Sequence, residues 1–148
     1  LLILLASTMP LADALEAEEV GILTTIIGWL NTMFSQINPA LFVIVVGLVF
    51  LLATQVAHNM ILMIVFIPVL TKMALSYGVN PILVASIIFV AANTAFLTPA
   101  ASANAALIFG NTDWVETKQA YLYGFAIVVV GALVISFVGV PLGTLLFV

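Results

Sequence analysis

The sequence predicts an all-α integral membrane protein, and three observations lead to this fold class. Of the 148 residues, 66% are hydrophobic and only 5% are charged, whereas about a quarter of the residues in soluble domains are charged. The charges are also confined to a few places, so residues 20–71, 73–112 and 119–148 contain no formal charge. Because a helix needs about 20 apolar residues to cross a bilayer, these runs leave room for roughly five membrane elements.

The remaining composition excludes several classes of function. The net charge is −4, so the chain offers no basic surface for nucleic acid. There is no cysteine, which excludes disulfides and thiolate chemistry. An intramembrane enzyme would need a nucleophile beside a base. The charge-free interior offers only His58 as a base and no Gly-x-Ser-x-Gly motif, so we expect neither an enzyme nor a cofactor.

Residues 1–37 are expected to hold the end of a scaffold-type helix and then an amphipathic membrane helix. The second helix begins near Val20, just after four acidic residues, which favour a helix N-terminus. Its apolar residues recur at helical spacing, and its other face is polar but uncharged, which suits packing against protein inside a membrane. The chain opens on five aliphatic residues without an initiator methionine or a basic segment. We therefore expect a piece of a longer protein.

Residues 38–78 are predicted to form a re-entrant helical hairpin with its tip at 54–59. Two aliphatic runs, 40–53 and 60–74, flank the polar segment Thr-Gln-Val-Ala-His-Asn. The segment could lie within one long helix, or two short arms could meet there. An arm of 15 residues rises about 22 Å, which is short of a hydrocarbon core of about 30 Å. The lengths therefore favour the hairpin, which the turn signals Gly78, Asn80 and Pro81 bring to an end.

Residues 81–111 are predicted to form a broken transmembrane helix with the break at 97–104. The segment after Val90 is rich in Ala, Ser, Thr and Asn and contains Pro99, before an apolar run resumes at Leu107. Irregular backbone at membrane depth is tolerated only where it is buried in protein or lines a wet cavity. The break is therefore expected to face other protein or a binding site.

The last element is predicted to be a transmembrane helix over residues 119–148. Gly124, Gly131 and Gly139 would allow it to pack closely against a neighbour. Asp113 and Glu116 have the spacing of a capping box at its start. Trp114, Tyr121 and Tyr123 lie where interfacial aromatic residues are expected.

The two polar breaks are the strongest indication of function. Paired discontinuous helices point to a transporter binding site, because freed carbonyls can coordinate Na⁺ and half-helix N-termini can hold an anion. Asn59 is a candidate ligand or a helix cap, and Asn104 is a candidate ligand or the N-cap of the second half-helix. His58 could contact an anionic substrate or relay a proton, or it could be a neutral hydrogen-bonded imidazole. No carboxylate lies at depth, which favours Na⁺ over H⁺ as the coupling ion.

The sequence resembles the C-terminal repeat of the divalent anion:sodium symporter family. The resemblance rests on the hairpin tip followed by an aliphatic run with Pro68, on Gly-Val-Asn-Pro at 78–81, and on FLTPAASANAALIFG at 96–110. His58-Asn59-Met60 replaces the family's Ser-Asn-Thr, and residues 99–105 lack its double proline. The resemblance implies an elevator-type carrier with two inverted repeats. It places a sodium site at Thr54, Ala57, Asn59, Ala101 and Ser102, and substrate contacts at Asn59, Ser102 and Asn104, beside the candidate His58.

The resemblance also implies the partners. We expect a small anion such as a di- or tricarboxylate, Na⁺, the lipid bilayer, the missing N-terminal half of the same transporter and a second copy in a homodimer. The expected location is a bacterial inner membrane, crossed several times. The family belongs to the wider ion-transporter superfamily. The alternatives are another carrier of that superfamily (an arsenite or sodium/proton exchanger, or a binding-protein-dependent carrier) or a membrane subunit that transports nothing. The last alternative predicts that the two breaks lie apart.

Overall fold

The computed structural model describes Gly28, Thr32 and residues 38–146. Apart from Gly28 and Thr32, the helices predicted within residues 1–37 therefore lie outside the described residues. All regular structure in the described part of the chain is helical. The elements are α3 (Pro39–Ala53), α4 (Asn59–Ser76), α5 (Pro81–Asn93), α6 (Ala103–Gly110), α7 (Thr117–Val134), the π-helix η1 (Ile135–Gly139) and α8 (Val140–Leu146).

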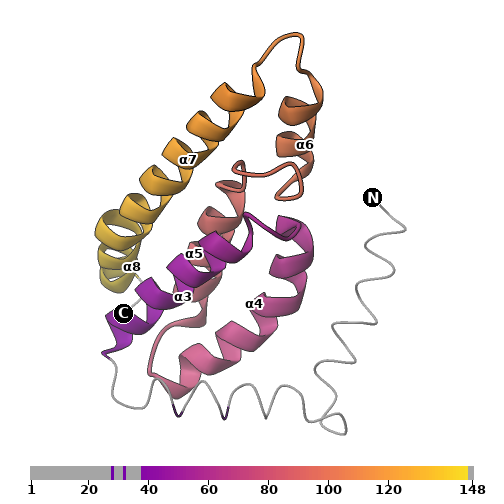
Figure 1. Cartoon of the computed structure of the whole chain (residues 1–148). Helices are drawn as coiled ribbons and strands as arrows, with labels where there is room; N and C mark the ends of the chain where they lie inside the picture. Colours follow the sequence, from indigo (N-terminus) through magenta and orange to yellow (C-terminus); the bar gives the residue numbers. More distant parts are fainter. Residues whose placement is uncertain (1–27, 29–31, 33–37, 147–148) are drawn as a thin grey trace, which may run out of the picture.

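The helices α3 and α4 meet at a polar tip, and α5 packs against both of them (Figure 1). Asn38 caps α3 by accepting a hydrogen bond from Ala40 N at 2.9 Å, and Pro39 occupies the first turn, where its missing N–H costs nothing. Asn80 and Pro81 begin α5 in the same way. The repeated Asn-Pro pair thus sets where each helix begins. The two arms also contact each other, because the rings of Phe50 and Phe66 pack edge to face.

The second arm is longer than the sequence suggested. α4 has 18 residues, which corresponds to about 27 Å, and Pro68 lies inside it. The side chain of Thr71 donates hydrogen bonds to the carbonyls of Ile67 and Pro68, at 2.7 and 3.1 Å. By length and composition, α4 and the continuous run Thr117–Leu146 could each cross a membrane, whereas α3 and α5 are shorter.

The broken helix is interrupted from residue 94 to residue 102, three residues earlier than the predicted start of the break. Both hydrogen-bond donors of Thr94 bond to the last turn of α5. Its N–H and its hydroxyl donate to Ala91 O, at 3.2 and 2.7 Å. These bonds tighten the last turn and end the helix before the proline is reached. The chain then loops and resumes as α6 at Ala103.

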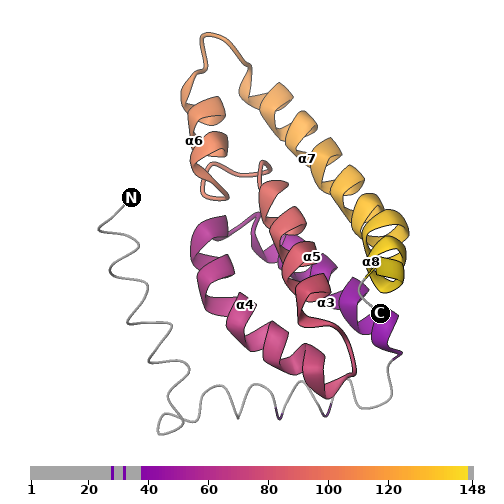
Figure 2. The same ribbon diagram turned by 180° about the vertical axis from the view of Figure 1, so that it is seen from behind.

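The final helix packs against both α3 and α5 (Figures 1 and 2). Several of its glycines make the closest approaches to neighbouring residues. Gly131 lies against Thr94, Gly139 against Ile87, and Gly143, which the sequence analysis did not single out, against Leu83. The π-helix between Gly131 and Gly139 accommodates one extra residue, since Val140 N–H bonds to Ile135 O. The extra residue keeps Gly139 and Gly143 on the same face of the helix as Gly124 and Gly131.

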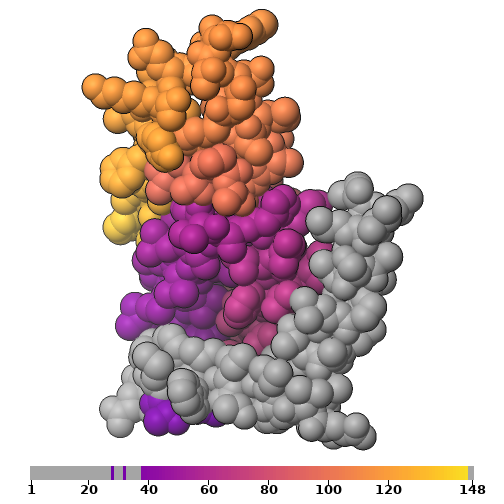
Figure 3. Space-filling model, turned by 45° about the vertical axis from the view of Figure 1, so that its right-hand side comes forward, coloured from indigo at the N-terminus to yellow at the C-terminus, as the bar shows by residue number. Residues whose placement is uncertain are grey.

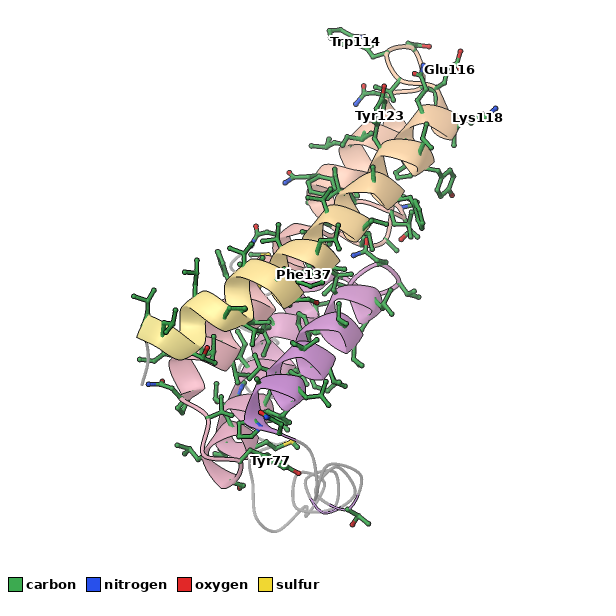
Figure 4. The ribbon with its side chains drawn as sticks, turned by 90° about the vertical axis from the view of Figure 1, so that its left-hand side faces the viewer. Tyr77, Trp114, Glu116, Lys118, Tyr123 and Phe137 are labelled. Atoms are coloured by element: carbon green, nitrogen blue, oxygen red, sulfur yellow. The ribbon has the colours of Figure 1, made fainter. Side chains whose placement is uncertain are left out.

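The predicted capping box at the start of this helix is wrong. The N-cap is Glu116 itself, without a side-chain hydrogen bond, so Asp113 lies three residues before the cap. Asp113 instead belongs to a turn in which the N–H groups of Trp114 and Val115 bond to Asn111 O, at 3.0 and 3.2 Å. Glu116, Trp114 and Tyr123 lie at one end of the molecule and Tyr77 at the other, while Phe137 projects outward between them (Figure 4). Phe137 is one of many exposed large apolar side chains, and a surface of this kind suits a lipid or protein environment.

Candidate functional site

Four helix ends meet in one layer. α3 and α5 end there, at Ala53 and Asn93, and α4 and α6 begin there, at Asn59 and Ala103. We call residues 54–59 the tip, residues 94–102 the break, and the two together the tip–break layer. In Figure 3 the break and α6 lie directly above the hairpin. Helix C-termini present carbonyls with partial negative charge, and N-termini present N–H groups with partial positive charge. The layer therefore has groups suited to both a cation and an anion.

Asn59 connects the two halves of the layer. Its N–H donates to Ala101 O at 2.9 Å, which joins the tip to the break. Its side-chain Nδ2 donates to Ala92 O near the end of α5, at 3.0 Å. Its Oδ1 accepts from Met60 N at 2.8 Å, within the first turn of α4. Asn59 thus bonds to a helix end and a helix beginning at once.

Ser102 is buried and is the N-cap of α6. Its Oγ donates to Ala95 O at 2.7 Å and accepts from Ala105 N at 3.1 Å, so the hydroxyl uses both of its functions. Ala101, the residue before it, is fully buried and supplies the carbonyl that Asn59 contacts. Ser102 therefore connects the start of the break, at Ala95, to the first turn of α6, at Ala105.

The other predicted ligands lie in different surroundings. Thr54 is fully buried, and its hydroxyl donates to Leu51 O at 2.8 Å. Ala57 is exposed, although it belongs to the same tip. Of the five predicted sodium ligands, the structure joins Asn59 and Ala101 directly, places Ser102 next to Ala101, and places Thr54 and Ala57 in the tip. No described hydrogen bond joins the side chains of Asn59 and Ser102 to each other.

His58 and Asn104 differ from the other polar candidates because neither side chain has a hydrogen bond within the described residues. His58 is the N-cap residue of α4 but makes no capping bond, and its Nδ1 is buried without a partner. Asn104 is exposed at the start of α6. The alternative role of Asn104 as N-cap is wrong, because Ser102 occupies that position.

Gln55 lies in the predicted tip but was not among the predicted site residues. It is buried, its Oε1 accepts from Leu97 N at 3.1 Å, and its Nε2 donates to Leu51 O at 2.8 Å. A glutamine inside a long charge-free segment was a signal that could have identified it, because a polar side chain at depth requires partners. The tip is thus bound to the break on both sides, through Gln55 and through Asn59.

The layer contains no Asp, Glu, Lys or Arg side chain. Among the residues that the structure describes, no group of three or more His, Cys, Asp or Glu side chains could hold a metal ion. The available ligands are backbone carbonyls, hydroxyls and amides. Such oxygens suit a weakly bound alkali cation better than a permanently held transition metal.

A test of the local structure is the substitution Ser102→Ala. We expect a loss of about 1–2 kcal/mol in local stability, because the N-cap bond disappears and Ala95 O loses its donor. Hydrogen exchange should therefore become faster in residues 103–110. Ser86→Ala is the control, since that hydroxyl bonds only to Ile82 O in its own helix. Equal exchange of α6 in both variants would contradict the capping role.

Taken together, these features define a helical membrane protein built around two interrupted helical segments that face each other. A family model described as "Sodium:sulfate symporter transmembrane region" matches residues 1–148. The chain belongs to this family, which is the divalent anion:sodium symporter family that the motifs resemble. Membership confirms the resemblance and makes this chain part of a membrane protein.

Individual relatives agree with this assignment. The sodium-dependent dicarboxylate transporter SdcS of Staphylococcus aureus strain USA300 is 29% identical over 113 residues, which is 74% of this chain and 22% of the relative. SdcS from strains NCTC 8325 / PS 47 and COL gives the same values. The chain thus spans less than a quarter of the length of these relatives. No solved structure matches the chain.

Proposed function

We propose that this chain is part of a sodium-coupled carrier of a small anion, such as a di- or tricarboxylate. The observation that carries the proposal is the bond between Asn59 N and Ala101 O, because it brings two helix interruptions into one layer. Family membership and the sodium-dependent dicarboxylate transporter among the relatives support the same conclusion. A membrane subunit that transports nothing would have no need for two breaks that face each other.

In the proposed site, Na⁺ binds to oxygens of Thr54, Ala57, Asn59, Ala101 and Ser102. The anion contacts His58, Asn59, Ser102 and Asn104, close to the N-termini of α4 and α6. The layer has no Lys or Arg, so the bound cation supplies the positive charge that attracts the anion. This accounts for coupling: without Na⁺, an anion in this layer would meet only partial charges and would pay much of its desolvation cost uncompensated.

We further propose that α3 and α4 form a re-entrant hairpin and that the layer moves by an elevator mechanism. α3 has 15 residues, about 22 Å, and ends at the tip, short of a full crossing. The remainder of the site comes from the rest of the carrier, since the relatives are far longer than this chain. The carrier acts as a homodimer in a bacterial inner membrane.

Uptake into proteoliposomes tests the proposal. The complete protein is reconstituted, and uptake of radiolabelled succinate, citrate or sulfate is measured with an inward gradient of Na⁺, of K⁺ or of H⁺. We expect uptake of at least one anion to require the Na⁺ gradient. Uptake driven by H⁺ alone, or export of arsenite, would instead favour another branch of the superfamily. Uptake of none of these solutes under any gradient would contradict the carrier function.

A further inference from the structure

Gln55 also holds the tip and the break together. Besides accepting from Leu97 N, its amide donates through Nε2 toward Thr94 O at 3.4 Å. Its own backbone carbonyl accepts a hydrogen bond from the hydroxyl of Thr98. One buried residue of the tip therefore contacts the break at three positions, 94, 97 and 98. Asn59 adds the contact at Ala101, so the two residues fix both ends of the segment between them.

Both functions of the amide are needed at this position. Oε1 meets a donor, Leu97 N, while Nε2 faces three acceptors: the carbonyls of Leu51 and Thr94 and the hydroxyl of Thr54. An apolar side chain of similar size would leave Leu97 N without its acceptor, whereas Leu51 O and Thr94 O would keep Thr54 Oγ1 and Phe96 N as donors. An N–H group without a partner in this partly buried position is costly, so the break would shift or open to reach another acceptor.

We propose that Gln55 is the positioning residue of the sodium site. Its side chain does not bind the ion. Its amide holds residues 94–98 against the tip, which keeps Ala101 and Ser102 close enough to Asn59 for the three residues to bind one Na⁺. This inference rests on the proposed function and adds to it a residue that neither the motifs nor the family match assigns. A positioning residue acts on the affinity for Na⁺, because a loosened break must be ordered again before the ion binds.

The test uses Gln55→Leu in the complete protein, with Gln119→Leu as the matched control at an exposed site on α7. Hydrogen exchange of residues 94–102, which contain the reporter amide Leu97 N, is measured in Na⁺ and in K⁺. We expect exchange about tenfold faster in Gln55→Leu and a loss of the slowing that Na⁺ causes in the wild type. The Na⁺ concentration for half-maximal succinate uptake should rise about tenfold, with little change in the maximal rate.

Thr98→Val provides a second variant in case Gln55→Leu does not fold. It removes only the hydroxyl bond to Gln55 O, and we expect the same changes with a smaller size. Unchanged exchange of residues 94–102 in a folded Gln55→Leu protein overturns the proposal, as does faster exchange with an unaltered response to Na⁺. If wild-type uptake ignores Na⁺ while exchange at Leu97 still becomes faster, the sodium-coupled function fails but Gln55 remains the residue that holds the break.

Discussion

Replacing Gly124 by alanine is expected to destabilise the protein by about 1–3 kcal/mol and to displace the break. A Cβ atom at this position would lie 2.6 Å from Phe96 O and 3.0 Å from the Cα atom of Leu97. Both neighbours are backbone atoms, so no side chain can rotate away to make room. The main chain of the break must move instead, and Leu97 is also the residue whose N–H bonds to Gln55.

The stability of Gly124→Ala can be measured by thermal unfolding in detergent, beside the control Gly110→Ala. Gly110 ends α6, and nothing lies within 4 Å of the position that its Cβ would take. We expect the control to unfold close to the wild-type temperature and Gly124→Ala to unfold well below it. If both variants matched the wild type, α7 could not pack against the break as closely as this structure shows.

The largest effect on transport is expected from Asn59→Ala. The variant keeps the backbone bond to Ala101 O but loses the side-chain bonds to Ala92 O and Met60 N. It also loses the oxygen that is proposed as a ligand of both Na⁺ and substrate. Two hydrogen bonds of about 1 kcal/mol each amount to more than the roughly 1.4 kcal/mol that corresponds to a tenfold change. We therefore expect sodium-dependent succinate uptake to fall by more than about tenfold.

Asn111→Ala is the matched control for this substitution. Its Nδ2 bonds to Leu107 O at 2.7 Å, so the same amide-to-carbonyl bond is removed outside the tip–break layer. Uptake by this variant should remain close to that of the wild type. Uptake by Asn59→Ala at the wild-type level and with the same dependence on Na⁺ would remove Asn59 from the proposed site.

The small number of charged residues in the chain has a mechanistic reason if the tip–break layer is the proposed transport site. A site made of neutral oxygens and helix ends carries no fixed charge that would need a counter-ion after the ligands leave. A bound cation offsets part of the negative charge of the anion when the layer is loaded, and the empty layer has no Asp, Glu, Lys or Arg of its own. Both states therefore carry less net charge through the membrane than the anion alone would. This difference in charge is the physical basis on which the proposed carrier could move loaded and empty, but not with the anion alone.

Local features of the sequence were enough to place most of the helices. Asn38-Pro39 and Asn80-Pro81 mark the starts of α3 and α5, because both signals act within one turn of the chain. The polar tip between two aliphatic runs was likewise visible without a structure. The end of α5 was missed by three residues, since it depends on Thr94 bonding back to Ala91 rather than on Pro99. The capping box failed for a similar reason: the turn at Asn111 shifted the start of the helix.

By itself, the sequence determined that this is a helical membrane protein, where its helices are interrupted, and which family it resembles. These properties follow from hydropathy, turn residues and motifs, all of which are local along the chain. Only the tertiary structure decided that Asn59 contacts Ala101, that Gln55 holds Leu97, and that Gly124 touches the break. Such contacts join residues 27 to 42 positions apart, and they depend on how each helix is rotated about its axis. In nearly uniform aliphatic helices, the pattern of side chains does not specify that rotation, so packing against α5 must set it.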